Sequence, residues 1–114
     1  NWYSFVLTAD MYNFFYQYWF PGMPWDNLEH YMKYSPISYV GNVTTPTMLL
    51  TGENDYRTPM SETEQYYQAL KLEGVDTAMV RIQDSGHGIY ARPSNLMNKV
   101  AYILHWFDKY RGTK

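Results

Sequence analysis

The sequence predicts an α/β fold in which two parallel strands and the helix between them form a βαβ unit, followed by a C-terminal helix. A short apolar run at residues 47–51 is bounded by Pro46 and Gly52, as is typical of a strand buried in a parallel sheet. A second strand is predicted at residues 77–82, after a helical pattern, and a longer helical pattern closes the chain. The crossover between the two strands should be right-handed.

An aromatic-rich segment, residues 1–35, precedes this unit and is expected to be helical. Tyrosine, tryptophan and phenylalanine make up 19% of the chain, and they are almost contiguous between Tyr12 and Phe20. The sequence PGMP at residues 21–24 would break any helix there. A second short helix is expected from about Asn27 to Tyr34, because the residue before a proline avoids helical angles and Pro36 follows.

The two later helices carry start and stop signals. Residues 61–64 (SETE) match a capping box, in which Ser61 and Glu64 would satisfy each other's free main-chain donors. Gly74 predicts the end of that helix. The last helix should open at Pro93 or Ser94. Its apolar positions form one stripe at helical spacing: Met97, Val100, Ala101, Leu104 and Phe107.

Composition argues against several classes of function. The 114 residues carry a net charge of −2 without a dense cluster of lysine and arginine, so no nucleic-acid partner is expected. Cysteine is absent, which excludes disulfides, thiolate metal sites and a cysteine nucleophile. No apolar run approaches the ~18 residues of a membrane span, and no membrane partner is expected. No metal or other cofactor is expected either, because His30, His87 and His105 lack metal-ligand spacing and no glycine-rich phosphate loop occurs.

The loops after the two predicted strands carry a candidate catalytic pair. Asp55 lies in GENDYRTP after the first strand, and His87 lies in SGHG after the second, 32 residues further on. The carboxyl ends of adjacent parallel strands share one edge of the sheet, where ligands bind in open α/β sheets. Asp55 would accept a hydrogen bond from Nδ1 of His87, leaving Nε2 to take a proton from a serine hydroxyl. Either residue alone would be interpreted as structural, and it is their order and joint placement that predict chemistry.

The serine that such a pair would activate is missing from the chain. No Gly-x-Ser-x-Gly turn occurs, and in α/β-hydrolases the serine precedes the acid and the histidine. Residues 1–114 are therefore expected to form the C-terminal part of an α/β-hydrolase fold, without the nucleophile-bearing part. Two buried parallel strands also need neighbours on their edges. We expect the chain alone neither to catalyse nor to fold stably as a monomer.

The chain resembles the C-terminal part of the peptidase domain in the prolyl oligopeptidase family of serine peptidases. Within that family it is most similar to acylaminoacyl-peptidase and dipeptidyl-peptidase-like members. The resemblance covers essentially the whole chain and is carried by residues 34–37 (YSPI), 46–52 (PTMLLTG), 54–59 (NDYRTP), 86–88 (GHG) and 103–107 (ILHWF).

This resemblance implies a role for several residues. Asp55 would be the acid and His87 the base of a Ser-Asp-His triad, and Arg57 would bind the substrate main chain near the scissile bond. The positions that match the primary specificity pocket are Phe14, Phe15, Thr58 and Tyr34. The parent enzyme implied is a serine peptidase that hydrolyses short peptides or acyl-peptides.

Two other functions stay open at this point. An esterase or lipase-like enzyme would use the same triad, and Arg57 with the aromatic residues favours peptides only weakly. The chain could instead be a non-catalytic piece that docks with the rest of a cleaved enzyme. The expected partners are thus a peptide substrate and either the remainder of the peptidase domain or a self-associating copy of the chain.

Overall fold

The computed structural model describes residues 1–112. In chain order its elements are α1 (Trp2–Thr8), α2 (Tyr12–Tyr18), α3 (Leu28–Lys33), the 3-10 helix η1 (Pro36–Asn42), β1 (Thr47–Gly52), α4 (Met60–Leu72), β2 (Thr77–Ile82) and α5 (Pro93–Tyr110). The strands are parallel and pair in register, from Thr47 with Thr77 to Gly52 with Ile82. The predicted α/β class and its βαβ unit followed by a C-terminal helix are confirmed.

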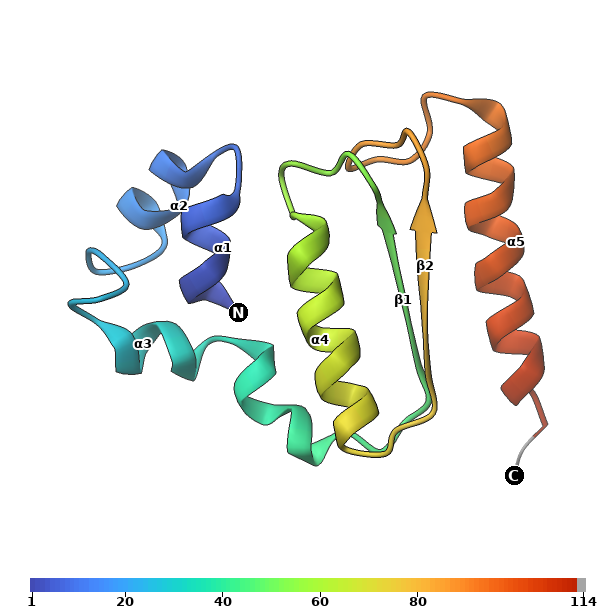
Figure 1. Ribbon diagram of the computed structural model, residues 1–114, viewed down its shortest axis with the longest axis horizontal. Helices are drawn as coiled ribbons and strands as arrows, with labels where there is room; N and C mark the ends of the chain where they lie inside the picture. The colour runs from blue at the N-terminus through green and yellow to red at the C-terminus, as the bar shows by residue number, and fades with distance from the viewer. Residues whose placement is uncertain (113–114) are drawn as a thin grey trace.

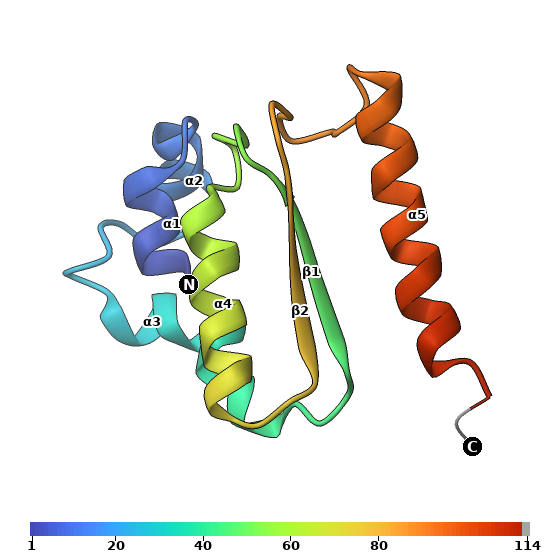
Figure 2. The same ribbon diagram turned by 45° about the vertical axis from the view of Figure 1, so that its right-hand side comes forward.

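The two strands lie between helices. Figure 1 shows α4 on one face of the pair and α5 on the other, with α1, α2 and α3 grouped beyond α4. The view in Figure 2 gives the same layers. Because the strands are parallel, their C-terminal ends meet at one edge of the sheet, and α1 and α2 lie toward that edge (Figure 1). The loops that follow the strands and the aromatic segment are therefore neighbours.

The aromatic segment forms a small core of its own from three short helices. The buried members of this core are Val6, Ala9, Phe15 and Tyr31. Phe20 stacks on Tyr31 with ring centroids 4.0 Å apart, and Phe5 meets Phe15 edge to face at 4.8 Å. Both geometries suit the charge distribution of aromatic rings. Ala9 has an extended conformation, which separates α1 from α2, and the segment at residues 21–24 separates α2 from α3 as expected.

The predicted capping box at the start of α4 is wrong. The helix begins at Met60, and its N-cap is Pro59, which makes no side-chain capping bond. Proline fixes its own backbone near helical φ, so the chain enters the helix before Ser61, which then lies inside the first turn. Glu64 instead pairs with Arg81 on β2 at 3.2 Å.

The predicted end of α4 is confirmed. Gly74 adopts a φ of +73°, in the left-handed region that glycine enters without a steric penalty. The N–H groups of Gly74 and Val75 donate to the carbonyls of Lys71 and Leu70, each at 3.0 Å. This pair of bonds is a Schellman motif, and it turns the chain from α4 into β2.

The first strand and α5 are largely open to solvent in the described chain. The apolar run of β1 suggests a strand buried on both faces, yet only Thr51 and Gly52 are buried. The described part of α5 has no buried residue, and its apolar stripe is open to solvent, with Met97, Leu104 and Phe107 at 71%, 62% and 68% exposed. The physical reason is that a sheet of two strands is too narrow to cover this helix face.

Candidate active site

The loops after β1 and β2 are joined through their main chains. The N–H of Glu53 donates to the carbonyl of Ile82 at 2.8 Å, and the N–H of Asn54 donates to that of Ser85 at 2.9 Å. Gly52 approaches so closely that a Cβ there would overlap the main chain of Ser85. Only glycine fits at this position, and its use brings the two loops side by side.

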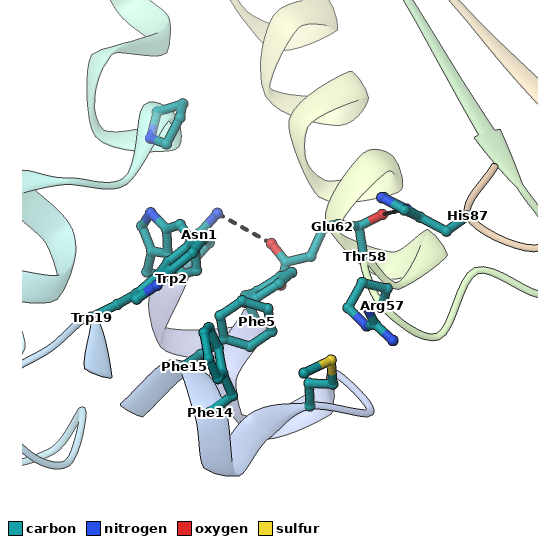
Figure 3. Close-up of a pocket in the computed structure, with 12 residues that line it drawn as sticks. Asn1, Trp2, Phe5, Phe14, Phe15, Trp19, Arg57, Thr58, Glu62 and His87 are labelled. Carbon is teal, nitrogen blue, oxygen red and sulfur yellow. Dashed lines mark hydrogen bonds and ion pairs between the residues drawn. The ribbon is translucent and has the colours of Figure 1, made fainter. Parts of the chain in front are cut away.

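Asp55 and His87, the expected acid and base, are hydrogen-bonded to each other. Nδ1 of His87 lies 2.8 Å from Oδ2 of Asp55. An ionised carboxylate can only accept, so Nδ1 carries the hydrogen and the lone pair of Nε2 remains available. Thr58 joins the pair, because its hydroxyl donates to Oδ2 of Asp55 at 2.6 Å. The same oxygen lies 3.1 Å from Nδ1 of His87, and Figure 3 shows these two side chains next to each other.

Asp55 is buried while His87 is open to solvent. The side chain of Asp55 is 5% exposed and that of His87 is 61% exposed. Oδ1 of Asp55 accepts the N–H groups of Arg57 and Thr58 at 3.1 and 2.8 Å. Burial by itself raises the pKa of Asp55, but the hydrogen bonds from Thr58 and His87 outweigh it and hold the pKa below its ordinary value. The carboxylate is thus charged at neutral pH and orients the exposed imidazole.

The loop that carries His87 is anchored by α5. Nδ2 of Asn95 donates to the carbonyl of Gln83 at 3.1 Å and to Oγ of Ser85 at 2.7 Å. Ile89, just beyond the histidine, is buried with a φ of +52°, a region that β-branched residues rarely enter. The loop therefore keeps a tight and specific path.

A cavity of about 560 Å³ lies beside His87. Four of the five expected substrate-binding residues line it: Phe14, Phe15, Arg57 and Thr58. Its lining is largely apolar, which is typical of a small-molecule or side-chain pocket. Figure 3 shows aromatic rings on one side of the cavity, with Thr58 and His87 on the other.

Sequence reasoning missed several residues of this wall: Trp2, Phe5, Met11, Trp19, Pro36 and Glu62. The only signal for the aromatic ones is the density of rings in residues 1–35. Their individual positions depend on how three short helices pack against one another, which no local pattern encodes.

Tyr34, the fifth expected residue, does not line this cavity. It lies after α3 and borders a second hollow together with Trp2, Trp19, Phe20 and His30. Trp2 and Trp19 border both hollows. The structure therefore places Tyr34 apart from the residues that surround His87.

Arg57 connects the loop of Asp55 to the aromatic segment. Its Nε lies 2.8 Å from Oδ1 of Asp10, and this hydrogen bond raises the pKa of Arg57. The N–H of Asp10 also donates to the carbonyl of Tyr56 at 2.8 Å. The link between α1 and α2 is thus fastened to the loop that holds Asp55.

Residues 1–112 show neither a metal-binding cluster nor a helix suited to span a membrane. No group of three or more histidine, cysteine, aspartate or glutamate side chains in residues 1–112 is arranged to hold a metal ion. Over the same residues, none of the helices combines the length and the apolar character that crossing a membrane requires.

Comparison with known proteins decides the family. Residues 1–114 match the family model described as the prolyl oligopeptidase family. This chain belongs to the prolyl oligopeptidase family. The predicted resemblance is confirmed, and its individual relatives agree with it.

Two curated relatives of this family member come from a bacterium and a plant. An uncharacterized peptidase of Bacillus subtilis, YuxL, is 33% identical over 112 residues, which cover 96% of this chain and 17% of that protein. An acylamino-acid-releasing enzyme of Arabidopsis thaliana is 35% identical over 85 residues, covering 75% of this chain and 11% of the relative. The chain thus spans less than a fifth of the length of either protein.

Solved structures place this family member in the α/β-hydrolase fold class, as predicted. The uncomplexed acylaminoacyl peptidase of Pyrococcus horikoshii superposes with a TM-score of 0.87 at 27% identity, covering 94% of this chain and 18% of that one. The same values hold for an acylaminoacyl peptidase in complex with Z-Gly-Gly-Phe-chloromethyl ketone. A puromycin hydrolase shares the fold, with a TM-score of 0.70 and 21% identity. The match covers 83% of this chain and 14% of the puromycin hydrolase chain.

Proposed function

We propose that this chain supplies the acid and the general base of a serine peptidase, as the C-terminal portion of its peptidase domain. The observation that carries the proposal is the 2.8 Å hydrogen bond between Asp55 and His87 at the carboxyl ends of adjacent parallel strands. Membership of the prolyl oligopeptidase family supports the same reaction class.

In this proposal Nε2 of His87 takes the proton of a serine hydroxyl contributed by another part of the parent protein. The serine oxygen attacks the scissile carbonyl, and His87 then gives the proton to the leaving amine, which leaves an acyl-enzyme. Water hydrolyses the acyl-enzyme by the same proton transfers in the second half of the reaction. Asp55 stays ionised throughout and stabilises the imidazolium, in accordance with its low pKa.

The proposed substrate is a short peptide or acyl-peptide with an apolar or aromatic residue on the acyl side of the scissile bond. The aromatic wall formed by Phe14 and Phe15 favours such a side chain. Arg57 at the rim offers a fixed cation to a substrate carbonyl or carboxylate. One structural relative was solved with a ligand that carries phenylalanine, which fits this wall.

The proposed partner of the chain is the remainder of the peptidase domain. The open apolar stripe of α5, with Met97 and Phe107 above two-thirds exposed, is the surface we assign to it. A second copy of the chain is the alternative, because the same exposed surface would serve self-association.

An ester-cleaving enzyme is the second candidate function. The apolar cavity would also accept a plain acyl group, and the same triad cleaves esters. Rates of the complete enzyme on a peptidyl amide and on a simple acyl ester, measured side by side, separate the two functions.

The proposed function is tested by Asp55→Asn in the complete enzyme that contains this chain. The variant keeps the shape of the site but favours the wrong histidine tautomer, and kcat should fall about 10⁴-fold. Asp108→Asn is a matched control on the surface of α5, where the aspartate pairs with Arg111 at 3.0 Å, and it should leave kcat unchanged. Unchanged turnover in the Asp55 variant would sink the assignment.

A further inference from the structure

One carboxylate beside the cavity has no part in the proposed chemistry. Glu62, in the first turn of α4, lines the cavity, and its side chain is 15% exposed. Its Oε1 accepts the hydroxyl of Ser4 on α1. Its Oε2 is buried and has no hydrogen-bond partner among the described residues, and it lies 3.1 Å from the nitrogen of Asn1, the N-cap residue of α1. Both oxygens of Glu62 are therefore directed at the first turn of α1.

The other end of α1 is fastened to the same part of the chain. Asp10, just after the helix, receives Nε of Arg57 and donates its own N–H to Tyr56. Residues 56–62 thus hold α1 at both ends. This segment begins next to Asp55 and contains Thr58, so it is fixed relative to the Asp55–His87 pair.

The position of α1 determines the shape of the cavity. Trp2 and Phe5 on α1 form part of the aromatic wall, opposite Thr58 and His87. Figure 3 shows Glu62 between this wall and the side of Thr58 and His87. Apolar burial of the rings is non-directional, whereas a shielded carboxylate loses much of its stabilisation when its hydrogen-bond donor, the Ser4 hydroxyl, moves away. Glu62 therefore adds a directional contact between α4 and the first turn of α1.

We propose that Glu62 is a positioning residue that fixes the distance between the aromatic wall on α1 and the Asp55–His87 pair, and so sets which side chains the cavity accepts. This inference rests on the proposed peptidase function for its substrate readout. A large aromatic side chain of a substrate would contact the aromatic wall extensively, whereas a small side chain would make few contacts with it.

A different role for Glu62 would be to bind a cationic substrate side chain. The structure favours positioning, because both carboxylate oxygens are already directed at Ser4 and Asn1 rather than at the open part of the cavity. The two roles predict losses on different substrates when Glu62 is replaced: a positioning role affects the Phe substrate, and cation binding affects the Lys substrate.

The test uses the complete enzyme and three peptide substrates that differ only in carrying Phe, Ala or Lys on the acyl side of the scissile bond. Glu62→Ala should raise KM for the Phe substrate about tenfold, since small displacements of a binding wall are costly, and leave kcat and KM for the Ala substrate nearly unchanged. Ser4→Ala should act in the same direction. Glu62→Gln should retain most of the wild-type preference, because its amide oxygen still accepts the Ser4 hydroxyl.

Glu64→Ala is the matched control on the same helix. Glu64 is half-exposed and pairs with Arg81 on β2 rather than with a residue of α1. The preference of the Glu64→Ala enzyme between the Phe and Ala substrates should therefore equal that of the wild type. An unchanged preference in Glu62→Ala overturns the proposal. Equal losses on all three substrates would show a general structural role, and a selective loss of the Lys substrate in Glu62→Gln would show cation binding; either result also overturns it.

A second measurement does not depend on peptidase activity. Amide hydrogen exchange over residues 2–8 should become about tenfold faster in Glu62→Ala and stay unchanged in Glu64→Ala, because the first turn of α1 loses one of its anchors, the bond from Ser4 to Glu62. Unchanged exchange contradicts the positioning role even if the proposed function is correct. A wild-type enzyme that cleaves none of the three substrates would contradict the proposed function, while the exchange experiment would still decide the role of Glu62.

Discussion

At the scale of single residues, Asp55 shows how a buried carboxylate is kept charged. Its two oxygens receive hydrogen bonds from two main-chain N–H groups, the Thr58 hydroxyl and the His87 ring. These donors overcome the cost of burial and lower the pKa of Asp55. Thr58 was expected from the family resemblance only as a pocket residue, yet it both lines the cavity and bonds to the pair.

Thr58→Val tests this second role, because valine keeps the shape of the side chain and removes the hydroxyl. Losing a hydrogen bond to a charged group should lower kcat of the complete enzyme about tenfold. Thr58→Ser restores a hydroxyl and should recover most of the activity. Turnover at the wild-type level in Thr58→Val would contradict the role.

The same substitution has a pH signature in stability. A depressed pKa means that Asp55 contributes stability above its ordinary value of 3.8, and that this contribution is lost as the pH falls through the lower pKa of the folded state. Thr58→Val removes a hydrogen bond that lowers the pKa of Asp55, so this pKa rises and the contribution of Asp55 to stability becomes smaller. The difference in thermal midpoint between wild type and variant should be largest near neutral pH and decrease in acid, and the serine variant should show little difference at any pH.

At the scale of elements, the parts predicted from sequence are those with local signals. Both strands and the end of α4 at Gly74 follow from apolar runs and turn chemistry. The start of α4 was not predicted correctly. The helix begins at Met60, directly after Pro59, and therefore before the apparent capping box at residues 61–64. The order of the loops predicted the contact between Asp55 and His87, but the wall formed by α1 and α2 arises from tertiary packing and was visible only as aromatic density.

The close contact between the end of β1 and the His87 loop is tested by Gly52→Ala. The new methyl group would overlap main-chain atoms of Ser85 and Gly86, which cannot move aside like a flexible side chain. Overpacking of this kind costs about 1–3 kcal/mol, so the thermal midpoint should fall and turnover with it as His87 shifts. Gly86→Ala is the control for stability, since its added Cβ would meet no described residue within 4 Å apart from its two chain neighbours. A thermal midpoint in Gly52→Ala equal to that of wild type would contradict the overlap.

At the scale of the whole molecule, the chain is more open than an autonomous domain of its size. Its accessible surface is 7687 Å², against roughly 6,600 Å² for a folded monomer of 13.6 kDa. Its radius of gyration is 15.8 Å, against about 13 Å for a typical domain of this length. The excess matches the apolar surface left open on α5 and the single pair of strands. The excess surface also agrees with the fact that this chain spans less than a fifth of the length of its two curated relatives.

This openness predicts how the 114-residue chain behaves by itself. Exposed apolar stripes drive association, so the isolated chain should sediment as species larger than 13.6 kDa and show no labelling by a fluorophosphonate. Replacing Leu104 and Phe107 with glutamate places two charges in the α5 stripe and should shift the distribution toward smaller species. Leu72→Glu is the control, because Leu72 is 78% exposed on α4 and lies outside the stripe. A wild-type chain that sediments as a monomer and unfolds in one cooperative transition would contradict this prediction. It would mean that the two strands and six helical segments of residues 1–112 bury enough surface to fold by themselves.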